Sequence, residues 1–348
     1  MTLWTLLIAC TTPQTPAPVA TAPNPTVPVD EAPTGELEVV SATVAAGAPV
    51  VDSLALAEGL AFALDNRAIA DWEEDGDLDV SSFQATCVVP SIVNGELVLA
   101  FSACGPLDGT MRLATSIPGP TTITFDDDFS IDGVDLDGSV QADLALLALT
   151  FDLDGDVTYG NVALELTLGI DLSAGVAIHG ELVYTDPDID LTVELGTPSD
   201  PLTFTLTCRC PDDGIASLDL EAPLNTVDVD LDALVTPFDG SDDYPALEVP
   251  IAPLTVPIFA ELDFTGACGN PSVTVTSQDV LVVVQTADVQ TALDQACLDG
   301  EVAPPDCASG TQVLTSLPAS VSLPVPLSLV AAGAETSLEA SLTAFCPI

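Results

Sequence analysis

Basic residues are almost absent from this chain. Among 348 residues there are three arginines, no lysine and one histidine against 54 acids, so the formal net charge is −51. Nucleic-acid binding is close to excluded, because phosphates are neutralised by Lys and Arg, and attraction to anionic lipid headgroups is disfavoured for the same reason. Catalysis through a lysine Schiff base is excluded because the chain contains no lysine. A Ser-His-Asp or Cys-His mechanism could use only His179 as its base.

Aromatic residues are also scarce, at 5% of the chain. Sugar-binding sites stack their ligands on aromatic rings, so a glycosidase that uses two carboxylates is only a third-ranked interpretation. The composition nevertheless indicates a folded protein, because 48% of the residues are hydrophobic and the mean hydropathy is +0.47.

The first 38 residues differ from the rest. A short apolar run, Leu3 to Ala9, directly precedes Cys10, and residues 11–36 contain seven prolines with no apolar period. Leu7-Ile8-Ala9-Cys10 resembles the lipobox of bacterial lipoproteins, which implies that Cys10 becomes the lipidated N-terminus. We therefore expect a lipoprotein-type signal segment at 1–9 and a Pro-rich extracytoplasmic linker at 10–38. Such a linker is extended and semi-rigid, at about 3.1 Å per residue.

The body of the chain shows a period of two. Apolar and polar residues alternate over 134–144, 149–159, 162–172, 176–184 and 189–195, which predicts half-buried antiparallel strands. Further strands are expected around 202–206, 227–231, 262–264, 273–275, 280–284, 321–329 and 338–346. Prolines at 250, 253, 257, 324 and 326 belong on edge strands or at strand ends.

Helices are expected at two places only, Val51–Ala70 and about Asp288–Leu298. The prediction is an all-β fold of antiparallel sheets, as a sandwich or an extended curved sheet, with one short N-terminal helix and disulfide bonds. Residues 39–196 form a first β-rich unit with the helix, and 197–348 form a second, Cys-rich unit. One large sheet unit or two smaller ones both remain open.

Eight cysteines follow Cys10, an even number that indicates disulfide bonds in an exported chain. Two pairs are local, Cys87 with Cys104 and Cys297 with Cys307. Cys208 and Cys210 share one face of a strand, and their adjacency disfavours a bond between them. Their expected partners are therefore Cys268 and Cys346. Zinc binding at Cys208-Arg209-Cys210 is a weak alternative, because no second cysteine pair or histidine lies nearby.

The region from Cys87 to Gly138 resembles uncharacterised surface lipoproteins of Gram-negative bacteria. The shared features are a cysteine, a Gly-centred hairpin, a second cysteine about sixteen residues on, an Asp-Gly turn and a strand series that contains further Asp-Gly steps. Here they are Cys87, Gly95, Cys104, Asp108-Gly109, Phe125, Asp132-Gly133 and Asp137-Gly138. The resemblance implies a β-rich, surface-anchored protein and supplies no catalytic residues.

Calcium binding is the most specific of the binding hypotheses, because closely spaced aspartates provide the hard oxygen ligands that Ca²⁺ prefers. The candidate ligands are Asp152, Asp154, Asp156, Asp135 and Asp137. The alternative is that these residues form Asp-Gly turns and solvated strand faces. Aspartate columns on adjacent strands would place like charges opposite each other with no lysine between them, and cations would compensate this repulsion.

The remaining polar candidates have simpler interpretations. His179 falls on the polar side of its strand, so we expect it to face solvent. Arg67, Arg112 and Arg209 are scarce enough that we expect them to pair with acids.

The sequence therefore predicts a non-enzymatic, lipid-anchored extracytoplasmic protein with a structural or adhesive role, located at the outer membrane or cell surface. It would contact a membrane through its N-terminal lipid only, with an unidentified protein or apolar ligand as a further partner. The alternative is a binding module for an apolar, lipid-like ligand between the aliphatic segments 144–151 and 249–260.

Overall fold

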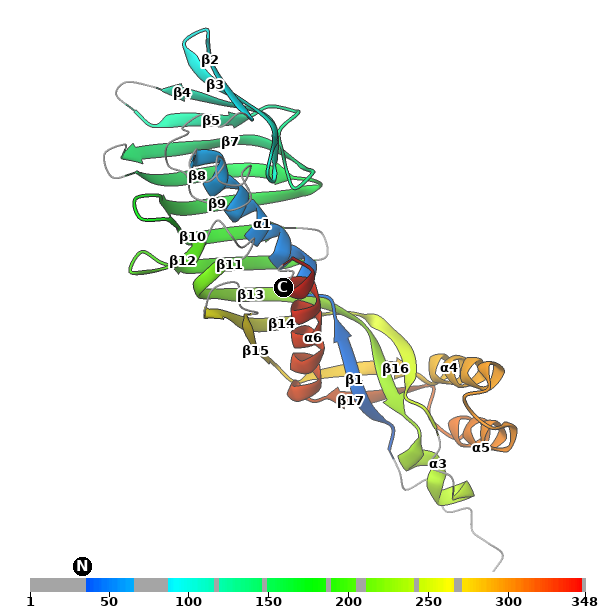
Figure 1. Ribbon diagram of the computed structural model, residues 1–348. Helices are drawn as coiled ribbons and strands as arrows, with labels where there is room; N and C mark the ends of the chain where they lie inside the picture. Colours follow the sequence, from blue (N-terminus) through cyan, green and yellow to red (C-terminus); the bar gives the residue numbers. More distant parts are fainter. Residues whose placement is uncertain are drawn as a thin grey trace, which may run out of the picture.

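A computed structural model of the chain describes residues 36–65, 87–115, 119–145, 149–185, 189–204, 211–240, 244–265 and 271–345. The fold is mostly antiparallel β-sheet, as predicted (Figure 1). Fifteen strands form one long sheet: β1 (Glu38–Val44), β2 (Val88–Val93), β3 (Glu96–Cys104), β4 (Leu107–Thr115), β5 (Thr121–Phe125), β6 (Ser130–Ile131), β7 (Val134–Ala145), β8 (Thr150–Tyr159), β9 (Val162–Asp171), β10 (Val176–Thr185), β11 (Asp190–Thr197), β12 (Asp200–Phe204), β13 (Pro211–Asp230), β14 (Leu247–Thr265) and β15 (Ser272–Ser277).

The sheet is extended, with its strands following one another along the length of the molecule (Figure 1). It is continuous from β2 to β15, and the predicted boundary between residues 196 and 197 falls within it, at the end of β11 that pairs with β12. A separate two-stranded ribbon contains β16 (Val280–Gln285) and β17 (Ser320–Val325). The strands predicted over 134–195 lie where the alternation placed them.

Five helices accompany the strands in the described part of the chain. They are α1 (Gly47–Leu64), α3 (Asp232–Asp239), α4 (Thr286–Asp299), α5 (Pro304–Leu314) and α6 (Leu327–Phe345). Helix α1 is largely apolar, with Asp52 and Glu58 as its two acids, and by length and composition it could cross a membrane, but 78% of it is buried inside the protein. It is therefore a core helix, and it packs against β6, β10, β11 and α6.

At the C-terminus one predicted strand is wrong and another is shorter than predicted. The segment 338–346 alternates in polarity, and its described part belongs to helix α6. The buried residues of α6 are Val330, Ala334, Leu338 and Leu342, spaced by four, and its many Ala, Leu and Glu residues favour a helix. The strand expected over 321–329 ends at Val325, because α6 begins at Leu327.

The prolines confirm the edge rule. Pro250, Pro253 and Pro257 lie in the part of β14 that pairs with β13 on one side, whereas β15 pairs only with Ile258–Asp263. Pro223 lies in the long strand β13, between the residues that pair with β11 and those that pair with β1. A proline has no N–H to donate, so these positions avoid the loss of a ladder hydrogen bond.

The core occupies one face of the sheet. Alternate residues of every central strand are almost completely buried there, such as Leu166, Ile178 and Val193, and α1 and α6 pack against this apolar side. The opposite face carries the polar residues of the same strands and is turned to solvent. The period of two therefore separates an apolar inner face from an outer face on which a functional site can form.

Candidate functional site: the acidic outer face

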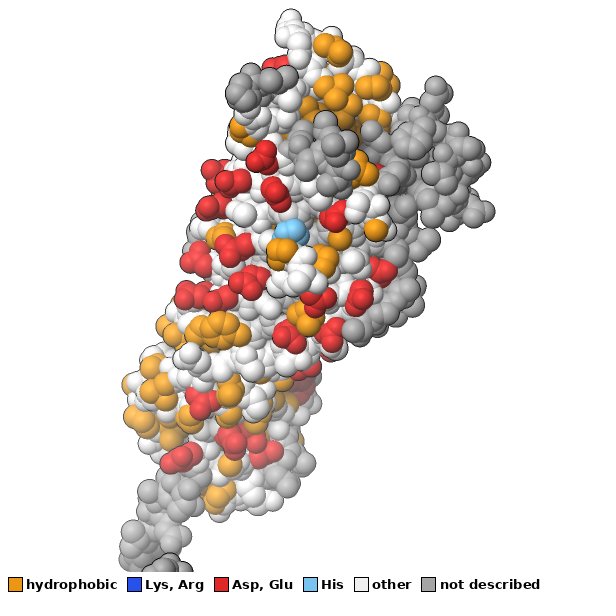
Figure 2. Space-filling model, turned by 90° about the vertical axis from the view of Figure 1, so that its left-hand side faces the viewer, with side chains coloured by type: hydrophobic (Ala, Val, Ile, Leu, Met, Phe, Trp, Pro, Cys, Tyr) orange, Lys and Arg blue, Asp and Glu red, His pale blue; other side chains and the backbone are white. Residues whose placement is uncertain are grey.

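The outer face of the sheet is covered with carboxylates (Figure 2). The strand register places several acids directly opposite other acids on the neighbouring strand. These pairs are Asp143–Asp152, Asp156–Glu165, Glu181–Glu194, Asp190–Glu221, Asp228–Glu248 and Glu38–Asp230. Like charges in directly opposite positions destabilise a sheet, so the repulsion expected from the sequence is built into the register.

His179 lies near the centre of this acidic face (Figure 2). It is partly buried, and it stands opposite Gly169 on β9, which in turn stands opposite Asp152 on β8. A Cβ atom on Gly169 would overlap the imidazole ring, so the ring lies over the bare backbone of this glycine. The expectation of solvent exposure is thus only partly met, because the ring is packed on one side.

Two neighbouring hollows adjoin His179. The larger has a volume of about 430 Å³, and its wall includes Asp143, Asp152, Asp154, Gln141 and His179. The smaller has a volume of about 230 Å³ and shares Asp152 and His179 with the first. Gly169 and Gly180 contribute bare backbone to the wall of the larger hollow, between β9 and β10.

Asp171 borders the smaller hollow. Its pKa is lowered from the ordinary value, first by a hydrogen bond from the Ser173 side chain, then by the Ser173 backbone N–H at 2.8 Å, and also by the field of His179. The carboxylate is therefore held in its charged form. The region around His179 combines one imidazole with several carboxyl groups, an arrangement that favours small cations and disfavours anions.

The predicted calcium ligands are all described and all exposed. Asp135 and Asp137 lie on β7, and Asp152, Asp154 and Asp156 lie on β8, each on the outer face. Asp154 stands opposite Gln141, and Asp137 stands opposite Thr158. Within the described residues, no group of three or more His, Cys, Asp or Glu side chains is arranged to hold a metal ion. Calcium binding remains a prediction. It rests on pairs of opposed acids, and not on a group of side chains that surrounds one position.

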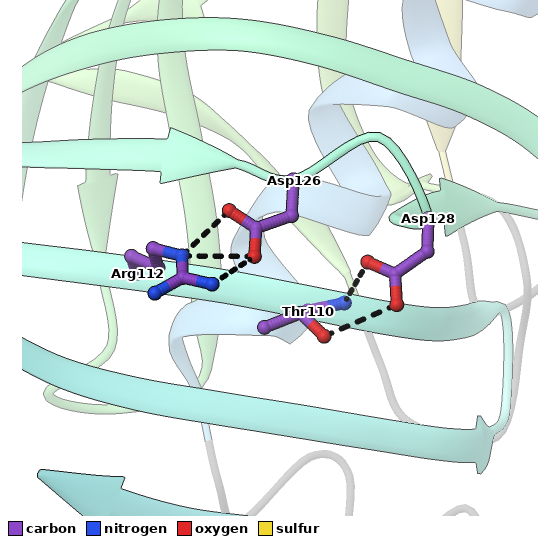
Figure 3. Close-up of polar contacts among 4 residues, drawn as sticks. All are labelled: Thr110, Arg112, Asp126 and Asp128. Carbon is purple, nitrogen blue, oxygen red and sulfur yellow. Dashed lines mark hydrogen bonds and ion pairs between the residues drawn. The ribbon is translucent and has the colours of Figure 1, made fainter. Parts of the chain in front are cut away.

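Arg112 is paired with an acid, as expected. Its Nε donates to both carboxylate oxygens of Asp126, at 2.7 and 2.8 Å, and its Nη2 lies 2.7 Å from Oδ2 (Figure 3). The hydrogen bond and charge of Asp126 raise the pKa of Arg112 above its ordinary value. Beside this pair, Asp128 accepts hydrogen bonds from the backbone N–H and hydroxyl of Thr110. Asp126 and Asp128 thus hold β4 to the turn after β5.

Two of the predicted disulfides are present. Cys87–Cys104 joins the ends of the β2–β3 hairpin with Cα atoms 5.3 Å apart, and Cys297–Cys307 joins α4 to α5 with Cα atoms 6.1 Å apart. These bonds are typical of an oxidising, extracytoplasmic compartment. Several predicted residues lie outside the described part of the chain, namely Cys10, Cys208, Cys210, Cys268, Cys346, Arg67 and Arg209.

The acids of helix α1 were not predicted as functional residues. Asp52 is half-buried, and desolvation raises its pKa, while Glu58 is buried in the core. The pKa of Tyr159 on β8 is raised well above its ordinary range by burial and then by the charges of Asp52, Asp132 and Glu58. The Tyr159 hydroxyl donates to the Ile131 carbonyl oxygen at 3.3 Å. Asp52 and Glu58 give no periodic signal in the sequence, because they are isolated acids within an otherwise apolar helix.

Comparison with known proteins gives no assignment. No protein-family model matches the chain, and neither a curated protein nor a solved structure matches it. The arrangement of the site must therefore carry the functional argument. The resemblance to Gram-negative surface lipoproteins stays a prediction, and its hairpin corresponds to β2 and β3, which turn at Asn94-Gly95.

One detail of that resemblance differs in the structure. Asp108-Gly109 is not a turn, because Gly109 lies within β4 and its backbone closely approaches the backbone of Asp128 and Phe129. Asp132-Gly133 is a turn with positive φ at both residues, between β6 and β7. The sequence signal was the same for both dipeptides, and tertiary packing decided between turn and strand.

Proposed function

We propose that this chain is a non-enzymatic, lipid-anchored protein of the cell envelope with a structural and adhesive role. The observation that carries the proposal is the continuous sheet, which presents one broad acidic face over a packed apolar layer. Such a sheet gives an extended, rigid body to hold a surface away from its anchor. The acid pairs across neighbouring strands contribute repulsion rather than stability, which favours a role in solvation and in contact with cations.

The placement of the chain ends supports the same role. The linker precedes β1, which begins at the end of the molecule occupied by α3, while the β2–β3 hairpin forms the opposite end (Figure 1). An anchor at Cys10 would attach the molecule through the α3 end. The sheet would then project the hairpin end away from the anchoring membrane.

The two disulfides support an extracytoplasmic location, and the outer membrane or cell surface is the compartment we propose. Lipidation at Cys10 is the part of the proposal that a single experiment can test. Cells that produce the wild-type chain or Cys10→Ser would be grown with a clickable palmitate analogue, and the chain would be isolated and probed for the label. We expect label on the wild-type chain and none on Cys10→Ser.

If neither form carries label, the anchored-display model loses its basis. If both carry label equally, the acyl chain is attached elsewhere and Cys10 is not the modified residue. A third measurement separates the alternative function: native mass spectrometry that finds a co-purified lipid within the folded domain would favour the apolar-ligand module over the adhesive role.

A further inference from the structure

The β2–β3 hairpin exposes four aliphatic side chains. Ile92 is 78% exposed, Val89 61%, Val93 42% and Leu97 40%. Hydrophobic side chains gather at this end of the molecule (Figure 2). Isolated exposed apolar residues are normal, but several neighbouring ones on a single hairpin indicate a contact surface.

One part of this surface continues the apolar core. Ile92 stands opposite Leu97, Leu97 opposite Leu113, and Leu113 opposite Ile123. Ile123 is 1% exposed, and exposure rises outward along this row until it reaches Ile92. The apolar inner face of the sheet is therefore exposed to solvent at its last two strands, β2 and β3.

The other face of the hairpin also exposes aliphatic side chains, Val89 and Val93, with Ser91 between them and Glu96 opposite Val93 at the turn. A surface built to dock on one protein face would need only one apolar side. Apolar residues on both sides of a projecting hairpin suit an environment that surrounds it, as lipid does.

The charge distribution favours an uncharged surface as the partner. Between Cys87 and Leu107 the only charged residue is Glu96, in a chain with 54 acids. This is a stretch where the molecule can approach another surface without bringing carboxylates to it. An anionic surface would still be repelled by the rest of the chain, whereas a zwitterionic bilayer would not.

The amount of apolar surface argues against a second copy of the chain as the partner. Its four side chains expose on the order of 400 Å², about half of the roughly 800 Å² per partner that a stable interface buries. Two copies with a net charge of −51 each would also repel one another.

The backbone of β2 disfavours strand addition as well. Val93 and Glu96 flank the two-residue turn, and the Cys87 carbonyl oxygen accepts from Ser102, so the odd-numbered residues of β2 face β3. The outward position between Val88 and Ile92 is Pro90, which has no N–H. This edge is protected against pairing with another strand.

We propose that the β2–β3 hairpin inserts its aliphatic side chains into the surface of a zwitterionic lipid bilayer. The Cys87–Cys104 disulfide fixes the base of the hairpin, so that its apolar side chains are held in place before contact. This inference deepens the proposed function, since it names a bilayer as the surface to which the distal end of the anchored molecule adheres.

Vesicle flotation with the full oxidised chain carrying Cys10→Ser tests the inference, because this form has no acylation site. Its partition onto phosphatidylcholine vesicles is compared with that of the same chain carrying Ile92→Ser and Val93→Ser. The matched control is Leu298→Ser on α4, which removes a side chain that is 81% exposed at the other end of the molecule. We expect the hairpin variant to lose more than tenfold in partition, since each CH₂ withdrawn from lipid weakens it roughly fourfold and the two substitutions withdraw several, and the control to match its parent.

A spectroscopic measurement accompanies it. Ile92→Trp, in a chain whose own Trp4 and Trp72 are changed to Phe, should show a blue shift of its tryptophan emission on phosphatidylcholine vesicles and a smaller shift on vesicles rich in phosphatidylglycerol. Circular dichroism checks that each variant is folded. Absence of vesicle binding, or binding that the hairpin substitutions leave unchanged, overturns the inference. Hairpin-dependent dimerisation in sedimentation velocity without vesicle binding overturns it in favour of a second copy. The palmitate-labelling result is independent of all these outcomes.

Discussion

Glu181 on β10 lies directly opposite Glu194 on β11, with both side chains exposed on the outer face of the sheet. Ser217 follows on β13, and Thr167 precedes on β9, so no basic residue lies beside this pair in the row. The pair illustrates how the sheet is built. Burial of the apolar inner face sets the strand register, and this register places acids opposite each other on the outer face.

Replacing Glu194 by Lys should therefore stabilise the protein. An opposite-charge pair in place of a like-charge pair contributes roughly 0.2–1 kcal/mol across neighbouring strands. Thermal unfolding at low ionic strength should show a higher Tm for Glu194→Lys than for the neutral control Glu194→Gln, and Gln above wild type. Added NaCl should narrow all three differences by screening. A Tm for the Lys variant at or below that of wild type would contradict this account of the outer face.

Calcium should stabilise the sheet beyond its effect on ionic strength. Millimolar CaCl₂ should raise the Tm more than NaCl of matched ionic strength, because a divalent ion can neutralise two opposed carboxylates. The extra shift should shrink when Asp152, Asp154 and Asp156 are changed to Asn, and persist when Glu339 on α6 is changed to Gln. Equal shifts from both salts would mean that cations act only as a diffuse atmosphere.

Stability should fall as pH rises through the pKa of Asp52. Burial raises the pKa of this carboxyl in the folded state, so between the unfolded and folded pKa values the folded chain binds more protons than the unfolded chain. The free energy of unfolding should therefore decrease over this interval as the pH increases. Asp52→Asn removes the titration, and its advantage over wild type should grow with pH.

Denaturant unfolding across a pH series measures that difference, with Glu339→Gln as the control. Repulsion among the other acids changes in the same direction with pH, and this is why the comparison between variants, rather than the wild-type curve alone, is the informative quantity. A constant difference between Asp52→Asn and wild type at all pH values would show that Asp52 does not titrate differently on folding.

The disulfide at the base of the β2–β3 hairpin should contribute about 3 kcal/mol, as estimated from closure of a loop of this length. Its cysteines lie 17 positions apart in the sequence. The double variant Cys87→Ser, Cys104→Ser should unfold at a lower denaturant concentration, and the Cys297→Ser, Cys307→Ser variant should show a similar loss. Dithiothreitol should lower the stability of wild type more than that of a chain with all four substitutions. Unchanged stability of the first variant would imply that the hairpin end is held by packing alone.

The sequence predicted the strands of the central sheet well, and Leu166, Ile178 and Val193 show why. Each is the buried member of an alternating run, and alternation is a local signal. The C-terminal helix was missed because Leu338 and Leu342 fit a period of two as well as a helical spacing. Helix α5 was not among the predicted helices, and it begins with Pro304 and Pro305, residues that are well suited to the first turn of a helix.

The candidate surfaces were less predictable than the fold. The polar parity of Glu181 and Glu194 was visible, but their direct opposition depends on the register between two strands, which a single strand does not encode. The exposure of Ile92 depends on where the sheet ends, since an equivalent residue further inside, Ile123, is buried. Local pattern determines which face a residue occupies, and tertiary structure determines what covers that face.

The central claim, that an anchored sheet adheres through its distal end, is tested most directly by capture of fluorescent phosphatidylcholine vesicles on cells. Three forms of the chain are compared at equal abundance: wild type, Cys10→Ser, and the variant with Ile92→Ser and Val93→Ser. The account predicts capture by cells carrying the wild-type chain and loss of capture with either set of substitutions. Capture that neither set diminishes would contradict it.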